Sequence, residues 1–105
     1  MSNHQSLNIL VIDRDESTIA QLKAILTQDG YQVDATTETA RTGDLVRTNS
    51  YQLVILDVSP GHQGGIDALQ TIRSIDNDLC VVATTELASV EMAVTTMKHQ
   101  ATLIL

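Results

Sequence analysis

Short runs of mainly apolar residues alternate along this chain with segments in which apolar residues recur at helical spacing. The runs cover residues 7–12, 53–56, 80–83 and 103–105 and predict strands, and a shorter strand is predicted at 32–35. Apart from Asn8, the first run is entirely apolar, and it does not alternate with polar residues. Such a run is typical of a strand that is covered on both faces, as in a parallel sheet.

Helices are predicted between these strands, over residues 17–28, 66–74 and 90–97, with a weaker one over 40–47. Asp15, Glu16 and Ser17 stand before the first of them as residues that start a helix. The segment 58–65 holds the only proline and three of the five glycines, which indicates a loop. Strands that alternate with helices, without a hairpin signal, predict a doubly wound α/β fold. We expect a flavodoxin-like sheet of five parallel strands with helices on both faces.

The composition limits which folds and which binding partners are possible. The 105 residues are 43% hydrophobic and form one domain over residues 1–105, with an aliphatic core because the only aromatics are two tyrosines. The net charge of −7 argues against binding to nucleic acid or an anionic membrane. The single cysteine, Cys80, excludes an intramolecular disulfide, and we expect it to be a small core residue. Without an apolar signal segment or a run of membrane-spanning length, the expected location is cytoplasmic.

Polar side chains follow three of the predicted strands. Asp13 follows the first, Asp57 ends the strand at 53–56, and Thr84 and Thr85 end the strand at 80–83. In a doubly wound sheet these strand ends open into one crevice. Carboxylates that converge there can hold Mg²⁺, and a carboxylate can also accept a phosphoryl group as an acyl phosphate. A hydroxyl opposite it could donate to the phosphoryl oxygens.

This arrangement resembles the receiver domain of two-component response regulators, over residues 7–105. VILD at 54–57, with Pro60 and Gly65 after it, is similar to the phosphoacceptor strand and loop, and SVEMAVTTMKHQATLIL at 89–105 to the fourth helix and fifth strand of receivers attached to sigma-54-type activators. The resemblance implies that Asp57 is the phosphoacceptor, that Asp13 and the backbone carbonyl of Ser59 help to bind Mg²⁺, and that Thr85 is the switch hydroxyl. Thr84 takes that last role if the register shifts by one residue.

The resemblance also implies the partners. A sensor histidine kinase would donate the phosphoryl group to Asp57, and contacts to a downstream output domain or regulator would then change. Such a domain is a phosphoacceptor rather than an enzyme, and at most catalyses its own phosphoryl transfer.

Several positions depart from the family pattern. Arg14 stands where the family has a second acid that binds the metal directly, and Glu86 where a small residue is usual. Pro60 comes one residue early, and Ile104 replaces an aromatic residue. The family's lysine and fifth helix would lie beyond Leu105. Without that helix, we expect an apolar face that either forms a homodimer or belongs to a longer regulator.

The role of Arg14 has two interpretations. A guanidinium beside the two aspartates would replace or weaken the magnesium site, which favours a pseudo-receiver that makes protein contacts without phosphorylation. Alternatively, Arg14 points into solvent with its stem on the first helix. An unrelated flavodoxin-like enzyme is disfavoured, because the chain has no phosphate-binding loop and almost no aromatic residues. We expect the helix face around Met97 to pack on the core, and His99 to be exposed.

Overall fold

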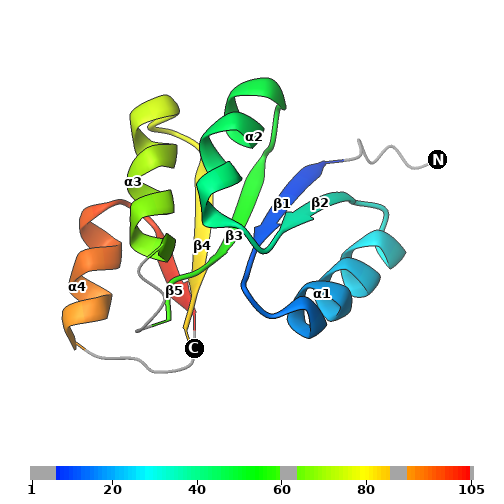
Figure 1. Ribbon diagram of the computed structural model, residues 1–105, viewed down its shortest axis with the longest axis horizontal. Helices are drawn as coiled ribbons and strands as arrows, with labels where there is room; N and C mark the ends of the chain where they lie inside the picture. Colours follow the sequence, from blue (N-terminus) through cyan, green and yellow to red (C-terminus); the bar gives the residue numbers. More distant parts are fainter. Residues whose placement is uncertain (1–6, 60–63, 86–89, 105) are drawn as a thin grey trace.

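The computed structural model describes residues 7–59, 64–85 and 90–104 of the chain (Figure 1). Its sheet has the order β2-β1-β3-β4-β5, and all neighbouring strands are parallel. The parallel α/β architecture predicted from the sequence is therefore confirmed. The strands are β1 (Asn8–Ile12), β2 (Gln32–Thr36), β3 (Leu53–Asp57), β4 (Cys80–Thr84) and β5 (Thr102–Ile104).

Helices connect consecutive strands and cover both faces of the sheet. α1 lies on one face, against β1 and β2, and α2 and α3 pack side by side on the other (Figure 1). The predicted weak helix at 40–47 is a 3₁₀ turn, η1, that runs into the short α2. The helical elements are α1 (Glu16–Gln28), η1 (Thr39–Arg41), α2 (Thr42–Thr48), α3 (Gly64–Ile75) and α4 (Val90–Lys98).

The position of β1 inside the sheet, between β2 and β3, explains the continuous apolar run at the start of the chain. Leu10 and Ile12 point into the core beneath α2 and α3, while Ile9 and Val11 point toward α1. All four side chains are buried, because helices cover both faces of this strand.

Three expectations about burial are wrong. Cys80 is exposed, because the alternate residues Val81 and Ala83 point into the core while Cys80 lies on the other face, where α1 covers β1 and β2. Met97 is 69% exposed, since the adjacent Thr96 is the buried residue among positions 94–98, the part of α4 whose side chains are described. His99, expected to be exposed, is half-buried.

A tyrosine hydrogen bond ties β2 to the entry of β3. The Tyr51 hydroxyl donates to Oδ2 of Asp34 at 2.6 Å, although β1 separates the two strands in the sheet. Tyr51 is buried in the core. Burial raises the pKa of its hydroxyl well above the ordinary value, and the acceptor Asp34 raises it further.

We expect Tyr51 to make the free energy of unfolding fall at alkaline pH. Because the folded pKa of Tyr51 lies above the unfolded value of about 10, its contribution is complete below that pH and is lost as pH rises beyond it. We expect Tyr51→Phe to lower the free energy of unfolding at pH 7 by about 1–2 kcal/mol and to reduce the alkaline fall. Urea denaturation between pH 7 and 11 measures both effects.

The second tyrosine serves as the control. Tyr31→Phe keeps the Tyr51–Asp34 hydrogen bond and should keep the alkaline fall. Equal pH profiles for the native chain and Tyr51→Phe would contradict the role given to Tyr51.

Candidate functional site

The carboxyl ends of β1, β3 and β4 bring the predicted polar residues together. β3 pairs with both β1 and β4, and Asp57 is in register with Thr84. A hollow of about 150 Å³ opens at these strand ends. We call it the oxygen hollow; it is lined by Asp13, Asp15, Thr18, Asp57, Ser59, Thr84 and Thr85.

Asp57 is held by the loop that follows it. Its Oδ1 accepts hydrogen bonds from the backbone N–H of Ser59 at 2.9 Å and from the Ser59 hydroxyl at 2.6 Å. The N–H of Val58 donates to the Thr84 carbonyl at 2.8 Å, which fixes the same loop to the end of β4. The carboxylate is half-buried and oriented before any ligand arrives.

Asp13 and Asp15 shape the other side of the oxygen hollow. Oδ1 of Asp13 accepts from the N–H of Asp15 at 2.9 Å, and Asp15 caps α1 by accepting from the N–H of Ser17 and the hydroxyl of Thr18. The interpretation of Asp15 as a helix-starting residue is confirmed. Sequence reasoning missed that Asp15 also lines the hollow, although its place three residues after the strand end was a signal.

Both candidate switch hydroxyls line the oxygen hollow. Thr85 is 6% exposed, whereas Thr84 is half-buried at the last position of β4. The choice between them for a switch role stays a prediction.

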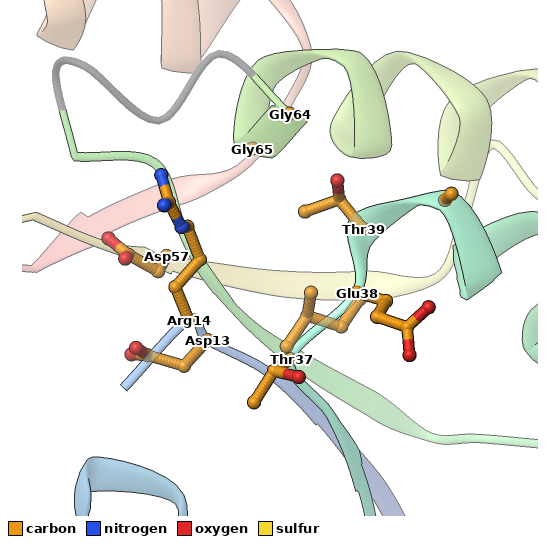
Figure 2. A pocket seen from close by; sticks show the side chains of 10 residues that line it. Asp13, Arg14, Thr37, Glu38, Thr39, Asp57, Gly64 and Gly65 are labelled. Atoms are coloured by element: carbon orange, nitrogen blue, oxygen red, sulfur yellow. The ribbon is translucent and has the colours of Figure 1, made fainter. Parts of the chain in front are cut away.

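Arg14 lies in a second hollow, of about 360 Å³, beside the first. Figure 2 shows its side chain rising from the end of β1 between Asp57 and the segment that leads from β2 into η1. Arg14 is exposed, as one of its two interpretations expected, but it lines this hollow with Asp57. We call it the arginine hollow; it is lined by Ile12, Asp13, Arg14, Thr37, Glu38, Thr39, Ala40, Asp57, Gly64 and Gly65.

The donor set of the oxygen hollow can hold Mg²⁺ through few protein ligands. Among the described residues, no group of three or more His, Cys, Asp or Glu side chains is placed to bind a metal. Mg²⁺ usually keeps several waters and needs only one or two carboxylates. Asp13 and Asp57 therefore suit a hydrated Mg²⁺, with one acid fewer than the family pattern and a cationic residue close by. The Ser59 carbonyl as a further ligand stays a prediction.

Two glycines join this site to α3, which begins at Gly64 and not after the predicted loop at 58–65. A Cβ on Gly65 would run into the Asp57 carbonyl oxygen and lie 2.9 Å from the Cα of Val58. A Cβ on Gly64 would run into the Thr39 side chain of η1. Close approach of the backbone, rather than turn geometry alone, therefore requires a glycine at position 65, whereas at position 64 the contact is with a side chain.

Some predicted positions lie outside the described residues. They are Pro60 and Glu86, and the side chain of Ile104 is likewise not described. Across residues 7–59, 64–85 and 90–104, no helix is long and apolar enough to span a membrane.

The chain is similar to known signalling proteins. The family model of the response regulator receiver domain matches residues 9–105. The chain is 33% identical over 95 residues to the transcriptional regulatory protein ZraR of Escherichia coli (strain K12), covering 90% of this chain and 22% of that protein. It is 30% identical over 84 residues to the response regulator MprA of Mycobacterium sp. (strain KMS), covering 80% of this chain and 36% of that protein.

The fold is also similar to that of a solved structure. The structure of the chemotaxis protein CheY4 of Vibrio cholerae superposes with a TM-score of 0.87 at 17% identity, covering 96% of this chain and 86% of that one. The chain spans only 22% and 36% of the two curated relatives, so it corresponds to one part of each. The chain therefore belongs to the response regulator receiver domain family of two-component signalling systems.

Proposed function

We propose that this receiver accepts a phosphoryl group on Asp57 from a sensor histidine kinase. The observation that carries the proposal is the orientation of the Asp57 carboxylate at the oxygen hollow, where Ser59 holds its Oδ1 and Asp13 and Thr85 line the same space. A carboxylate held in place can attack an incoming phosphorus without reorganising first.

The chemistry balances with groups of the two proteins and water. A carboxylate oxygen of Asp57 attacks the phosphorus of a phosphohistidine, and an O–P bond forms as the P–N bond breaks. The departing imidazole takes a proton from solvent. Hydrolysis later adds water to phosphorus, breaks the O–P bond and releases inorganic phosphate, which restores the carboxylate.

The other residues of the oxygen hollow take supporting roles in this proposal. Asp13, Asp57 and the Ser59 carbonyl would hold Mg²⁺, which when bound offsets negative charge on the phosphoryl oxygens. The Thr85 hydroxyl, or that of Thr84, would donate to a phosphoryl oxygen and so report the modified state. Both hydroxyls already line the space that the group would enter.

The output is proposed to be a change of protein contacts, to a downstream output domain or regulator or to a second copy in a homodimer. The similarity to a transcriptional regulatory protein suggests control of transcription as the final effect. Direct contact of this domain with nucleic acid is disfavoured by its net charge of −7. We further propose that these events take place in the cytoplasm.

One observation favours a second candidate function. Arg14 brings a permanent positive charge to a hollow that it shares with Asp13 and Asp57. If this charge prevents Mg²⁺ binding and phosphoryl transfer, the domain is a pseudo-receiver that acts through protein contacts alone.

Phosphorylation of the purified chain separates the two functions. With phosphoramidate and Mg²⁺, we expect the intact mass to rise by one phosphoryl group, and peptide mapping to place the group on Asp57. Asp57→Asn should abolish the increase because an amide cannot form the acyl phosphate.

Asp67→Asn is the matched control, since Asp67 is an exposed carboxylate in the first turn of α3 and lines neither hollow. It should accept the phosphoryl group like the native chain. A native chain that gains no mass with excess donor and Mg²⁺ would contradict phosphorylation and leave the pseudo-receiver.

A further inference from the structure

Asp13 and Asp57 form a common wall between the two hollows. They are the residues that line both, whereas Ser59 and the two threonines line the oxygen hollow and Arg14 lines the arginine hollow. Arg14 therefore shares Asp13 and Asp57 with the proposed Mg²⁺ site, but it lines the other hollow from Ser59, the third proposed ligand. A cation among those ligands and the guanidinium need not compete for one position.

The negative charges of Asp13 and Asp57 interact with the positive charge of Arg14, which lines one of the same hollows. Two carboxylates repel each other when both are ionised, and the permanent charge of a neighbouring guanidinium offsets part of that repulsion. The same charge opposes a divalent cation that binds to the same carboxylates. Because Arg14 is exposed and its hollow is open, both effects should weaken as salt is added.

Phosphorylation increases the negative charge at the wall. A phosphoryl group carries about −1.5 to −2 at neutral pH, whereas the carboxylate that it modifies carries a single charge. A fixed cation beside Asp57 gains interaction energy as this charge develops, without being recruited from solvent. Arg14 can thus supply part of what a metal ion would otherwise supply.

We propose that Arg14 is a built-in cation of the phosphoacceptor site, which weakens Mg²⁺ binding and allows phosphoryl transfer to Asp57 to proceed in part without it. This inference rests on the proposed function of Asp57, and adds that the site depends less on metal than its carboxylates alone would. Arg14 acts here through its charge on Asp57 and is a positioning residue rather than a nucleophile.

Binding of Mg²⁺ alone tests the first half of the inference. In a titration followed by amide NMR shifts of residues 13, 57 and 59, we expect Arg14→Gln to bind Mg²⁺ about fivefold more tightly than the native chain, and Arg14→Lys to resemble the native chain. Lys23→Gln removes one positive charge from the exposed side of α1 and should leave the affinity unchanged. Equal affinities for Arg14→Gln and the native chain would overturn the inference.

Phosphorylation in excess EDTA tests the second half. With phosphoramidate, the native chain and Arg14→Lys should retain part of their rate, whereas Arg14→Gln should lose about tenfold or more of it relative to native. Equal metal-free rates for native and Arg14→Gln would overturn this half. If no variant reacts even with Mg²⁺, the proposed function itself fails; the Mg²⁺ titration then still shows whether Arg14 opposes the cation.

Discussion

Replacing Gly65 by alanine is expected to lower the free energy of unfolding by about 2–3 kcal/mol and to displace Asp57. The new Cβ would run into the carbonyl oxygen of Asp57 itself and lie 2.9 Å from the Cα of Val58. Both neighbours are backbone atoms, of the last residue of β3 and of the residue that follows it, so neither can move aside by a change of rotamer. The first turn of α3 and the end of β3 must therefore separate.

The measurement is urea denaturation followed by circular dichroism, with the amide shifts of residues 57–59 recorded in the same samples. Gly43→Ala is the matched control because a Cβ there would meet the mobile end of Arg47 at 3.0 Å and Thr71 at 3.4 Å. Alanine also has the higher helix propensity, so this variant of α2 should be neutral or stabilising. Equal stabilities for the two variants would show that the β3–α3 junction accommodates a side chain.

The backbone contact at Gly65 illustrates what sequence reasoning could not supply. The glycine itself was identified through the family resemblance, but a pattern of residue types does not show how closely two backbones approach. The strands could be predicted because burial on both faces leaves a continuous apolar run, and Ile9 to Ile12 are all buried. Periodicity thus predicted which segments enter the core.

Periodicity did not predict which part of the sheet each helix covers. Cys80 starts an apolar strand, yet it is exposed because α1 packs on β1 and β2. Met97 recurs at helical spacing, yet it is exposed, and the polar Thr96 beside it is buried. In both cases the helix position, which depends on tertiary packing, decides the outcome.

The candidate site, like the fold, could be predicted only in part from the sequence. Topology brings all parallel strand ends to one edge, so the meeting of Asp13, Asp57 and Thr85 could be predicted. The two separate hollows, with Arg14 in one of them, depend on how the segment after β2 packs beside α3. The spacing of residues along the chain carries no such information.

A second large effect is expected from an arginine that no motif singled out. Arg73, near the end of α3, donates from Nε to the His99 carbonyl at 2.8 Å and from Nη2 to the Gln100 carbonyl at 2.9 Å. Its Nη1 donates to the Leu79 carbonyl at 2.6 Å and to the Asp76 carbonyl at 3.2 Å. One planar guanidinium thereby links the end of α3, the entry of β4 and the end of α4.

The end of α4 depends on this link because its geometry is unusual. Gln100 has a φ of 59°, in the left-handed region that favours glycine, and glycine takes the equivalent place after α1 as Gly30. Backbone hydrogen bonds from Gln100 to Met97 and from Ala101 to Thr96 close the helix in this conformation. Arg73 binds the Gln100 carbonyl in the same turn, and so helps to hold a backbone conformation that a side chain disfavours.

Arg73→Met is expected to lower the free energy of unfolding by about 2–4 kcal/mol, since it keeps the apolar stem but leaves partly buried carbonyls without their donor. Arg73→Lys should recover only part of the loss, because one ammonium cannot reproduce the planar fork. Urea denaturation measures the change, and hydrogen exchange should accelerate most in residues 94–102. Arg47→Met, which removes an exposed arginine from α2, should cost less than about 0.5 kcal/mol. An equally small cost for Arg73→Met would mean that water replaces the guanidinium and that α4 is held by its apolar contacts alone.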